Sequence, residues 1–266
     1  MALHDKTVFV AELVPSNRKL VEFSIIAGNT LGGIAEVASI LSKHKVNILT
    51  GFHDAGEWGF FADVTEIESS IDDIVKEISS LPIVSKVSLS EEVPEGIIVD
   101  SLHQQLRWGS SRSMIVKADV ISAMLNRIKG IFGPEGKAGK ALVFGMGEAA
   151  GRTGFQGLAD QIGAGVVRSH MKDMITLYAA QGWGDFKLTS LDFDKTTASV
   201  QAFNSFECAH LEGAGSPSSD FTCDFVRGHI TGLFSEMFGK KVDVTETLCV
   251  ARGHSHCQFD VSGVKQ

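Results

Sequence analysis

Apolar positions in the first ninety residues switch between the spacing of strands and that of helices. Strand patterns cover residues 7–14, 20–26, 46–54, 58–67 and 83–90. A helix is predicted at 28–46 because its apolar residues recur at positions i, i+3, i+4 and i+7: Ile34, Val37, Ala38 and Leu41. A second amphipathic helix is predicted at 70–81, with Ser70 as its N-cap and one apolar face made of Ile71, Ile74 and Ile78.

The order of these elements is β-α-β-β-α-β, which is the ferredoxin-like arrangement. We therefore expect one domain over residues 1–90. Residues 91–113 mix proline, glycine, serine and charged residues, and this composition predicts a linker.

The pattern changes near Met114. A strong helix is expected at 117–132, ended by Gly133, and its apolar stripe is broad enough to face both a sheet and a pocket: Val120, Ile121, Met124, Leu125, Ile128, Ile131 and Phe132. Helical stretches follow at 138–163 and 167–181, then strands at 187–193 and 197–205, a loop at 212–219, a helix at 223–239 and a terminal hairpin. The chain is thus predicted to be α+β, with a second domain over residues 114–263.

Composition narrows the class of protein. The chain has 266 residues and a formal net charge of −8, which argues against a nucleic-acid groove lined by Lys and Arg. The N-terminus lacks a basic segment followed by an apolar run, and no stretch of the sequence is apolar enough to cross a bilayer. We expect a cytoplasmic protein, in which four cysteines are thiols or metal ligands rather than disulfides.

Three of the cysteines lie near the C-terminus together with a glutamate, in the set Cys223, Glu246, Cys249 and Cys257. A short loop at 252–254 would bring the last two cysteines opposite each other. A bulge is then needed to bring the glutamate to the same face, because its strand parity differs from that of Cys249. Four such ligands would form a closed structural zinc site. The alternative is buried thiols that only fill space, and Cys208 is interpreted as one of these.

The C-terminal motif ETLCVARGHSHCQFDV, preceded by Cys223-Asp-Phe-Val-Arg-Gly, resembles the 4-vinyl reductase domain family. The family includes sensor domains of phenol- and xylene-responsive activators, which hold zinc with three cysteines and one glutamate. The resemblance covers about residues 114–263 and implies zinc at Cys223, Glu246, Cys249 and Cys257. It also implies a fold like that of NO-sensing and Golgi-transport ligand-binding proteins, an apolar pocket and a homodimer.

Candidate pocket residues come from the segment 167–186, which mixes flexible apolar side chains with polar groups. We select His170, Met174, Tyr178 and Trp183. The alternative is that these side chains fill a solid core.

The N-terminal half is similar to ACT domains, which are regulatory modules that often bind amino acids. The similarity rests on Asn29, Gly32 and Ile34, followed by Asn47 eighteen residues after the first asparagine. It implies an amino-acid site at Asn29, Gly32 and Asn47, although Leu31 stands where the family usually has proline. The alternative is that Asn29 only caps the helix and Asn47 only caps a strand.

Together these features favour a small-molecule-sensing regulatory protein that binds an apolar or aromatic ligand and acts through a protein partner. A reductase acting on a vinyl group of a tetrapyrrole is one alternative, although no nucleotide site is apparent. The glycines of FGMGEAAGRTG lack the dinucleotide spacing and are better explained by helix packing. A lipid-binding interaction module is the other alternative.

Overall fold

The computed structural model describes residues 11–14, 17–54, 56–93, 96–103, 106–108, 111–131, 136–208 and 221–264. The chain divides into two compact units, residues 1–106 and 107–266, which we describe separately. Both combine helices with antiparallel sheets, so the predicted α+β class is confirmed.

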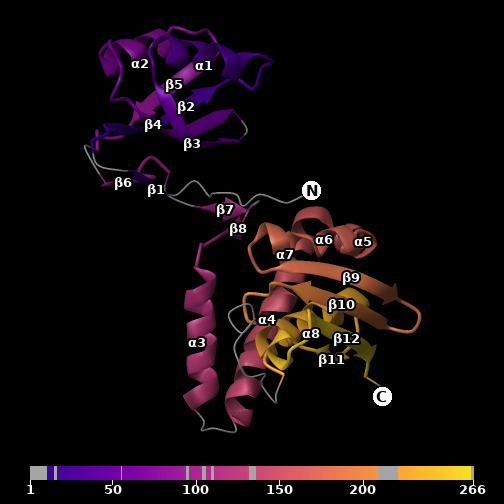
Figure 1. Ribbon diagram of the computed structural model, residues 1–266. Helices are drawn as coiled ribbons and strands as arrows, with labels where there is room; N and C mark the ends of the chain where they lie inside the picture. The colour runs from indigo at the N-terminus through magenta and orange to yellow at the C-terminus, as the bar shows by residue number, and fades with distance from the viewer. Residues whose placement is uncertain are drawn as a thin grey trace. The chain divides into compact units, whose positions relative to one another are not determined.

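The first unit has the predicted β-α-β-β-α-β core (Figure 1). Its elements are β2 (Leu20–Ala27), α1 (Gly33–Lys43), β3 (Asn47–Asp54), β4 (Glu57–Asp63), α2 (Ile71–Ser79) and β5 (Val84–Leu89). The strands form an antiparallel sheet in the order β3-β4-β2-β5. Ser70 caps α2 as predicted, because its side chain accepts a hydrogen bond from the Asp73 N–H.

The two faces of this sheet differ. One face packs against α1 and α2 and contains the main core of the unit, including Val21, Phe23 and Ile25 of β2. On the other face Leu20 and Phe61 pack with Ile98. Ile98 belongs to β6 (Gly96–Val99), which pairs with β1 (Ala11–Val14) in a small separate sheet. Residues 96–103, expected to be a linker, thus lie against the first unit, and the part of the first predicted strand before residue 11 lies outside the described residues.

The second unit begins with the short strands β7 (Arg107–Trp108) and β8 (Ser111–Arg112). It continues with α3 (Ala118–Ile131), α4 (Lys137–Ile162), α5 (Ala164–Ser169), α6 (Met171–Met174) and α7 (Leu177–Ala180). The strands β9 (Asp185–Asp192) and β10 (Thr197–Phe203) follow, then α8 (Asp224–Phe238), β11 (Val242–Leu248), the 3₁₀ turn η2 (Val250–Arg252) and β12 (Cys257–Gly263). The helix predicted at 167–181 is therefore three short helices, and the predicted stop at Gly133 lies outside the described residues.

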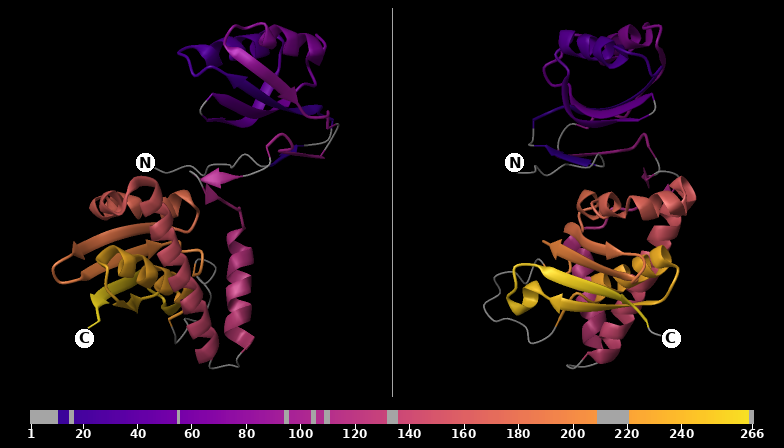
Figure 2. Two further views of the ribbon diagram at one scale, coloured as in Figure 1. Left: turned by 180° about the vertical axis from the view of Figure 1, so that it is seen from behind. Right: turned by 90° about the vertical axis from the view of Figure 1, so that its right-hand side faces the viewer.

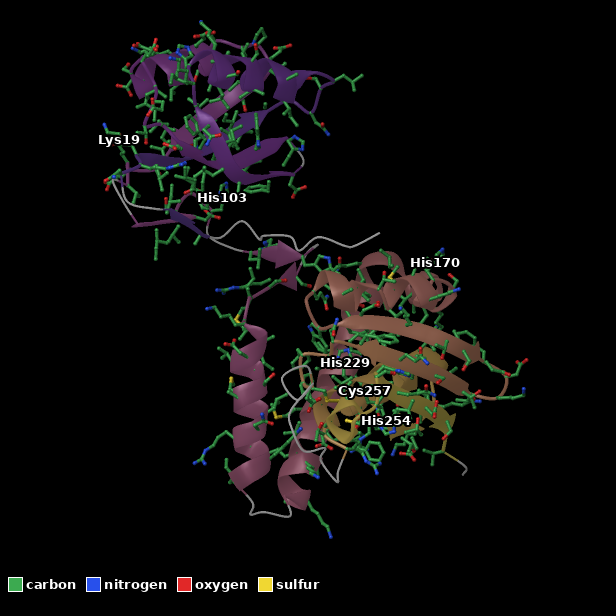
Figure 3. The ribbon with its side chains drawn as sticks, viewed as in Figure 1. Lys19, His103, His170, His229, His254 and Cys257 are labelled. Carbon is green, nitrogen blue, oxygen red and sulfur yellow. A yellow bond between two sulfur atoms is a disulfide. The ribbon has the colours of Figure 1, made fainter. Side chains whose placement is uncertain are left out.

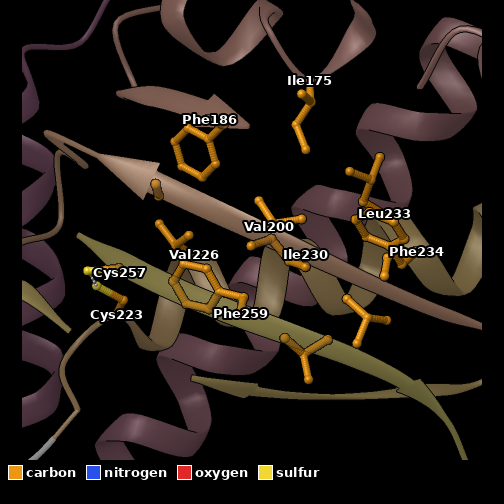
Figure 4. Close-up of a cluster of buried hydrophobic side chains, with 14 of the residues drawn as sticks. Ile175, Phe186, Val200, Cys223, Val226, Ile230, Leu233, Phe234, Cys257 and Phe259 are labelled. Carbon is orange, nitrogen blue, oxygen red and sulfur yellow. Dashed lines mark hydrogen bonds between the residues drawn. The ribbon is translucent and has the colours of Figure 1, made fainter. Parts of the chain in front are cut away.

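Helix α8 is buried between an antiparallel sheet, ordered β11-β12-β10-β9, and α4 (Figures 1 and 2). The apolar core between α8 and the sheet includes Val226, Ile230, Phe234 and Phe259 (Figure 4). Among the described residues, no helix is both long and apolar enough to span a bilayer.

Glycines allow α4 and α8 to approach closely. A Cβ atom on Gly147 or Gly151 would overlap a backbone carbonyl oxygen of α8, and one on Gly228 or Gly232 would overlap a carbonyl oxygen of α4. The glycine-rich stretch of α4 is thus a packing surface, as predicted.

The apolar stripe of α3 does not reach the core as expected. Val120, Met124 and Ile131 are 46%, 55% and 58% exposed, whereas Ser122 and Leu125 are the buried residues of the helix. The Ser122 hydroxyl donates to the Phe206 carbonyl, so this side of α3 faces the domain. The predicted stripe is therefore largely a surface.

Candidate functional site

Four cysteines gather where the start of α8 meets the end of the C-terminal hairpin. The sulfur atoms of Cys208, Cys223, Cys249 and Cys257 all lie within 4.8 Å of one another, and all four residues are buried. The Sγ atoms of Cys223 and Cys257 are 3.5 Å apart (Figure 4). The structure therefore brings together the three predicted cysteine ligands and adds Cys208.

The prediction that no disulfide forms is wrong. Cys208 and Cys223 are joined by a disulfide bond, and Cys249 and Cys257 are free thiols. Sequence spacing could not reveal this pair, because the chain between the two cysteines returns on itself before α8 begins.

Glu207 explains how Cys208 reaches the start of α8. Its carboxylate accepts hydrogen bonds from the N–H groups of Phe225 and Val226, at 3.1 and 3.0 Å. It thereby satisfies free donors of the first helical turn and complements the helix dipole. Lys129 of α3 contacts the same carboxylate at 2.8 Å. Sequence reasoning missed Glu207, because no helix starts next to it in the sequence.

Glu246 lies beside this cluster but is not part of the group of four sulfur atoms. The predicted bulge is present, because the register of β11 against β12 shifts between Glu246 and Leu248. One carboxylate oxygen accepts the Cys223 N–H at 3.3 Å, while the other is buried and has no hydrogen-bond partner. Burial, with the Cys249 thiol beside it, raises the pKa of Glu246 to about 9.

The connection between Cys249 and Cys257 is not the predicted three-residue loop. Cys249 precedes η2, which Gly253 ends with a φ of 87°. The Val250 N–H points to the Cys257 sulfur, at 3.4 Å. The neighbouring Cys257 thiol lowers the pKa of Cys249 and favours a thiolate there.

These residues fit a metal ion. Soft thiolate donors gather around one point, and a buried carboxylate oxygen nearby lacks a partner. A cation at this point would offset the negative charge of a thiolate and a carboxylate that burial otherwise disfavours.

A second feature of this unit is an apolar cavity of about 70 Å³. Apolar side chains from α4, α6, α7 and α8 form most of its wall, together with Trp108: Leu158, Met171, Met174, Ile175, Leu177 and Leu233. Tyr178, Gln181 and His229 supply the polar groups. This mixture is typical of small-molecule sites.

Tyr178 and His229 form the polar centre of this cavity. The Tyr178 hydroxyl lies 2.7 Å from Nε2 of His229, and Nδ1 of His229 is buried without a hydrogen-bond partner. Burial lowers the pKa of His229 to about 4 and raises that of Tyr178, so both groups are neutral near pH 7.

The predicted pocket residues have mixed outcomes. Met174 and Tyr178 line the cavity. Trp183 does not, although its ring packs 4.8 Å from that of His229. His170 is exposed, and its Nδ1 contacts the Val166 carbonyl, so its assignment to the pocket is wrong (Figure 3). His229 was missed, although its place among apolar residues in the sequence of α8 was a signal of burial.

The first unit contains a smaller cavity of about 50 Å³ before α1. Asn29 lines it, together with Thr30 and His53, whereas Gly32 and Asn47 do not. Gly32, with a φ of 87°, is the N-cap of α1, so the alternative role of Asn29 as the helix cap is wrong. Asn47 begins β3 and is exposed.

Comparison with known protein families decides what the C-terminal part is. Residues 198–262 match the model of the 4-vinyl reductase domain. The C-terminal part of the chain thus carries a 4-vinyl reductase domain, as its cysteine motif predicted. The ACT resemblance of the first unit stays a prediction.

Known proteins resemble this chain only over part of its length. An uncharacterized protein of Methanocaldococcus jannaschii is 25% identical over 92 residues, which are 35% of this chain and 52% of that protein. The chain therefore spans about half the length of this curated relative.

Among solved structures, the phenol-responsive sensory domain of the transcription activator PoxR, with phenol, aligns with a TM-score of 0.52 and 20% identity. The alignment covers 60% of this chain and 80% of that one, and it shows a shared fold. A vinyl-4-reductase family protein from Methanocaldococcus jannaschii aligns with a TM-score of 0.37, 16% identity and coverage of 57% and 85%. A trafficking protein particle complex subunit 3 from Naegleria fowleri, bound covalently to palmitic acid, has a TM-score of 0.36, 15% identity and coverage of 55% and 90%.

Proposed function

We propose that this chain is a small-molecule-sensing regulatory protein whose C-terminal unit binds an apolar or aromatic ligand. The observation that carries the proposal is the buried, unpaired Nδ1 of His229 in the wall of an apolar cavity. Leaving such a group unpaired costs about 1–3 kcal/mol, and a ligand hydroxyl would remove this cost. The fold shared with a phenol-responsive domain supports the same interpretation.

The cavity volume favours a ligand with a single ring. A volume of about 70 Å³ holds roughly five water molecules, since each needs about 10–15 Å³ of this measure. A phenol fits this scale better than a long acyl chain or a tetrapyrrole does. A sensor of small aromatic molecules is therefore favoured over a lipid-binding module or a tetrapyrrole reductase.

The experiment is a thermal-shift screen of the full chain with phenols, short fatty acids and tetrapyrrole precursors. A ligand that binds only the folded state raises the melting temperature by mass action. A phenol should give a concentration-dependent rise. If fatty acids or tetrapyrroles raise the melting temperature and phenols do not, the proposed ligand class is wrong.

Zinc is the second part of the proposal. Cys223, Glu246, Cys249 and Cys257 would hold one ion, with the partnerless oxygen of Glu246 as the fourth donor. A closed shell of four protein ligands leaves no position for substrate, so the ion would join the start of α8 to the terminal hairpin. Only a thiolate binds zinc, so Cys223 becomes a ligand when an external thiol reduces its disulfide with Cys208.

Regulatory output requires contact with another protein, and the surface of α3 supports a homodimer. Val120, Met124 and Ile131 expose apolar side chains along this helix, and Leu142 and Met146 do so on α4. Exposed apolar patches of this kind mark interaction surfaces. Ligand binding in the cavity would then change how the dimer meets a protein partner.

An amino acid bound to an ACT-type first unit completes the proposal. Support comes from Asn29 and Thr30, whose side chains line the small cavity before α1. Amide and hydroxyl groups pair with both the ammonium and the carboxylate of an amino acid. Calorimetric titration of the full chain with the common amino acids tests it, and the absence of heat with every one of them would contradict it.

A further inference from the structure

A buried carboxylate lies on the face of the first unit's sheet that is turned away from its helices. Glu22 of β2 is 0% exposed, and it pairs across the sheet with Phe61 of β4. Its side chain lies beneath the segment 100–103, which follows β6. A carboxylate at such a position needs compensating partners, because burial disfavours its charge.

Only one of the two Glu22 oxygens has hydrogen bonds. Oε2 accepts from the Ser101 N–H and hydroxyl, at 2.8 and 3.0 Å, and from the Leu102 N–H at 3.3 Å. Oε1 is buried and accepts no hydrogen bond. The three bonds to Oε2 hold the carboxylate in one orientation and leave Oε1 as an available donor atom.

Two other donor atoms converge on Oε1. Nδ1 of His103 lies 3.3 Å from it and 2.9 Å from Oδ1 of Asp100. Donor atoms of Glu22, Asp100 and His103 all lie within 4.8 Å of one another. The Asp100 carboxylate also accepts the His103 N–H at 3.0 Å, which closes the turn that places both residues over β2.

The far side of the imidazole is also held. Nε2 of His103 lies 3.1 Å from Oε1 of Glu57, and the Ser24 hydroxyl donates to the same oxygen at 2.9 Å. Gly59 makes room for the ring, since a Cβ atom there would lie only 3.0 Å from Cε1 of His103. A carboxylate on the second nitrogen is the usual partner of a metal-bound histidine, because it fixes the tautomer that presents a lone pair to the ion.

We propose that Glu22, Asp100 and His103 form a binding site for a divalent transition-metal cation, with Glu57 as the residue that orients His103. Two carboxylate oxygens and one imidazole nitrogen suit ions such as Mn²⁺ or Zn²⁺. The ion would take the place between Nδ1 and the two carboxylates, and it would fix residues 100–103 on the sheet. This site is independent of the cysteines and of the ligand cavity.

The alternative occupant is a proton. A doubly protonated His103 facing three carboxylates would form an ion-pair network without metal. The two cases differ in whether the full chain binds a metal ion that depends on Glu22 and His103.

The test is a count of bound ions. Metal-free full chain is titrated with Mn²⁺ and separately with Zn²⁺, and bound metal is measured by elemental analysis after gel filtration. Mn²⁺ is informative because it prefers oxygen ligands to thiolates. We expect one ion in the wild type and in Cys249→Ser with Mn²⁺, and loss of that ion in Glu22→Gln and His103→Gln. The matched controls Glu36→Gln and His53→Gln should keep it.

Glu57→Gln provides a graded outcome, with an affinity about 10–100-fold lower, as removal of an outer-shell partner does. If Glu22→Gln fails to fold, as judged by circular dichroism, Asp100→Asn replaces it. Equal numbers of bound Mn²⁺ and Zn²⁺ ions in the wild type and in the folded variants of this triad would overturn the proposal in favour of the proton.

Discussion

The Tyr178 hydroxyl lies 2.7 Å from Nε2 of His229, and this pair is the polar centre of an otherwise apolar cavity. The His229 ring is also packed against Trp183, with ring centres 4.8 Å apart. Burial therefore makes protonation of His229 unfavourable, and its pKa falls to about 4.

This lowered pKa predicts a loss of stability in acid. The unfolded state binds a proton near the ordinary histidine pKa of about 6.5, whereas the folded state binds it only near 4, so stability falls as the pH drops through this window. The loss should reach about 3 kcal/mol at its acid end. Urea unfolding at pH 7.5, 5.5 and 4.5 measures it.

His229→Gln should remove this part of the pH dependence, because glutamine does not titrate. The exposed His170, as His170→Gln, is the matched control and should keep it. An unchanged pH dependence in His229→Gln would contradict the assignment.

The close packing of α4 on α8 predicts that one methyl group is costly. Gly228→Ala should destabilise the protein by about 3 kcal/mol or more, because the new Cβ overlaps the Phe144 carbonyl oxygen and both helices must separate. Gly157→Ala is the control on α4, where a Cβ would meet no atom within 4 Å. It should be neutral or stabilising by up to about 1 kcal/mol, as alanine is a better helix former. Similar losses in the two variants, by chemical denaturation, would argue against this packing.

The identity of the fourth zinc ligand is also testable. With reductant present, we expect one zinc per chain in the wild type and in Cys208→Ser, and loss of tight binding in Glu246→Gln and Cys249→Ser. Cys249→Ser should also lower the free energy of unfolding, because metal binding is coupled to folding. Elemental analysis and the charge-transfer bands of the Co²⁺-substituted protein report stoichiometry and thiolate number. Loss of the ion in Cys208→Ser but not in Glu246→Gln would instead indicate a four-cysteine site.

The exposed face of α3 predicts a dimer that a charge disrupts. Met124→Glu should shift the protein toward the monomer, because it places a charge in an apolar contact. Asn126→Glu, on an exposed polar position of the same helix, should not. Light scattering at micromolar concentration measures the mass, and a monomeric wild type would contradict the dimer.

Sequence patterns revealed the features that local periodicity controls. The helix capped by Ser70 and the bulge after Glu246 were predictable, because each depends on neighbours close in the chain. The exposed stripe of α3 was not, since periodicity shows that a helix has an apolar face but not what covers it. The proximity of Cys208 to Cys223 and the role of His229 depend on contacts between distant segments. Neither contact leaves a local signal in the sequence.

The most direct test of the sensor proposal fills the cavity with a side chain. Gly154 lines the cavity, whereas Gly157, three residues later on α4, does not, so Gly154→Leu and Gly157→Leu are matched in chemistry and helix propensity. Isothermal titration of the full chain with phenol measures affinity in each. We predict that the wild type and Gly157→Leu bind phenol and that Gly154→Leu, correctly folded by circular dichroism, binds at least tenfold more weakly. Equal affinity in the two leucine variants would show that phenol binds elsewhere, and no binding to the wild type would contradict a phenol sensor.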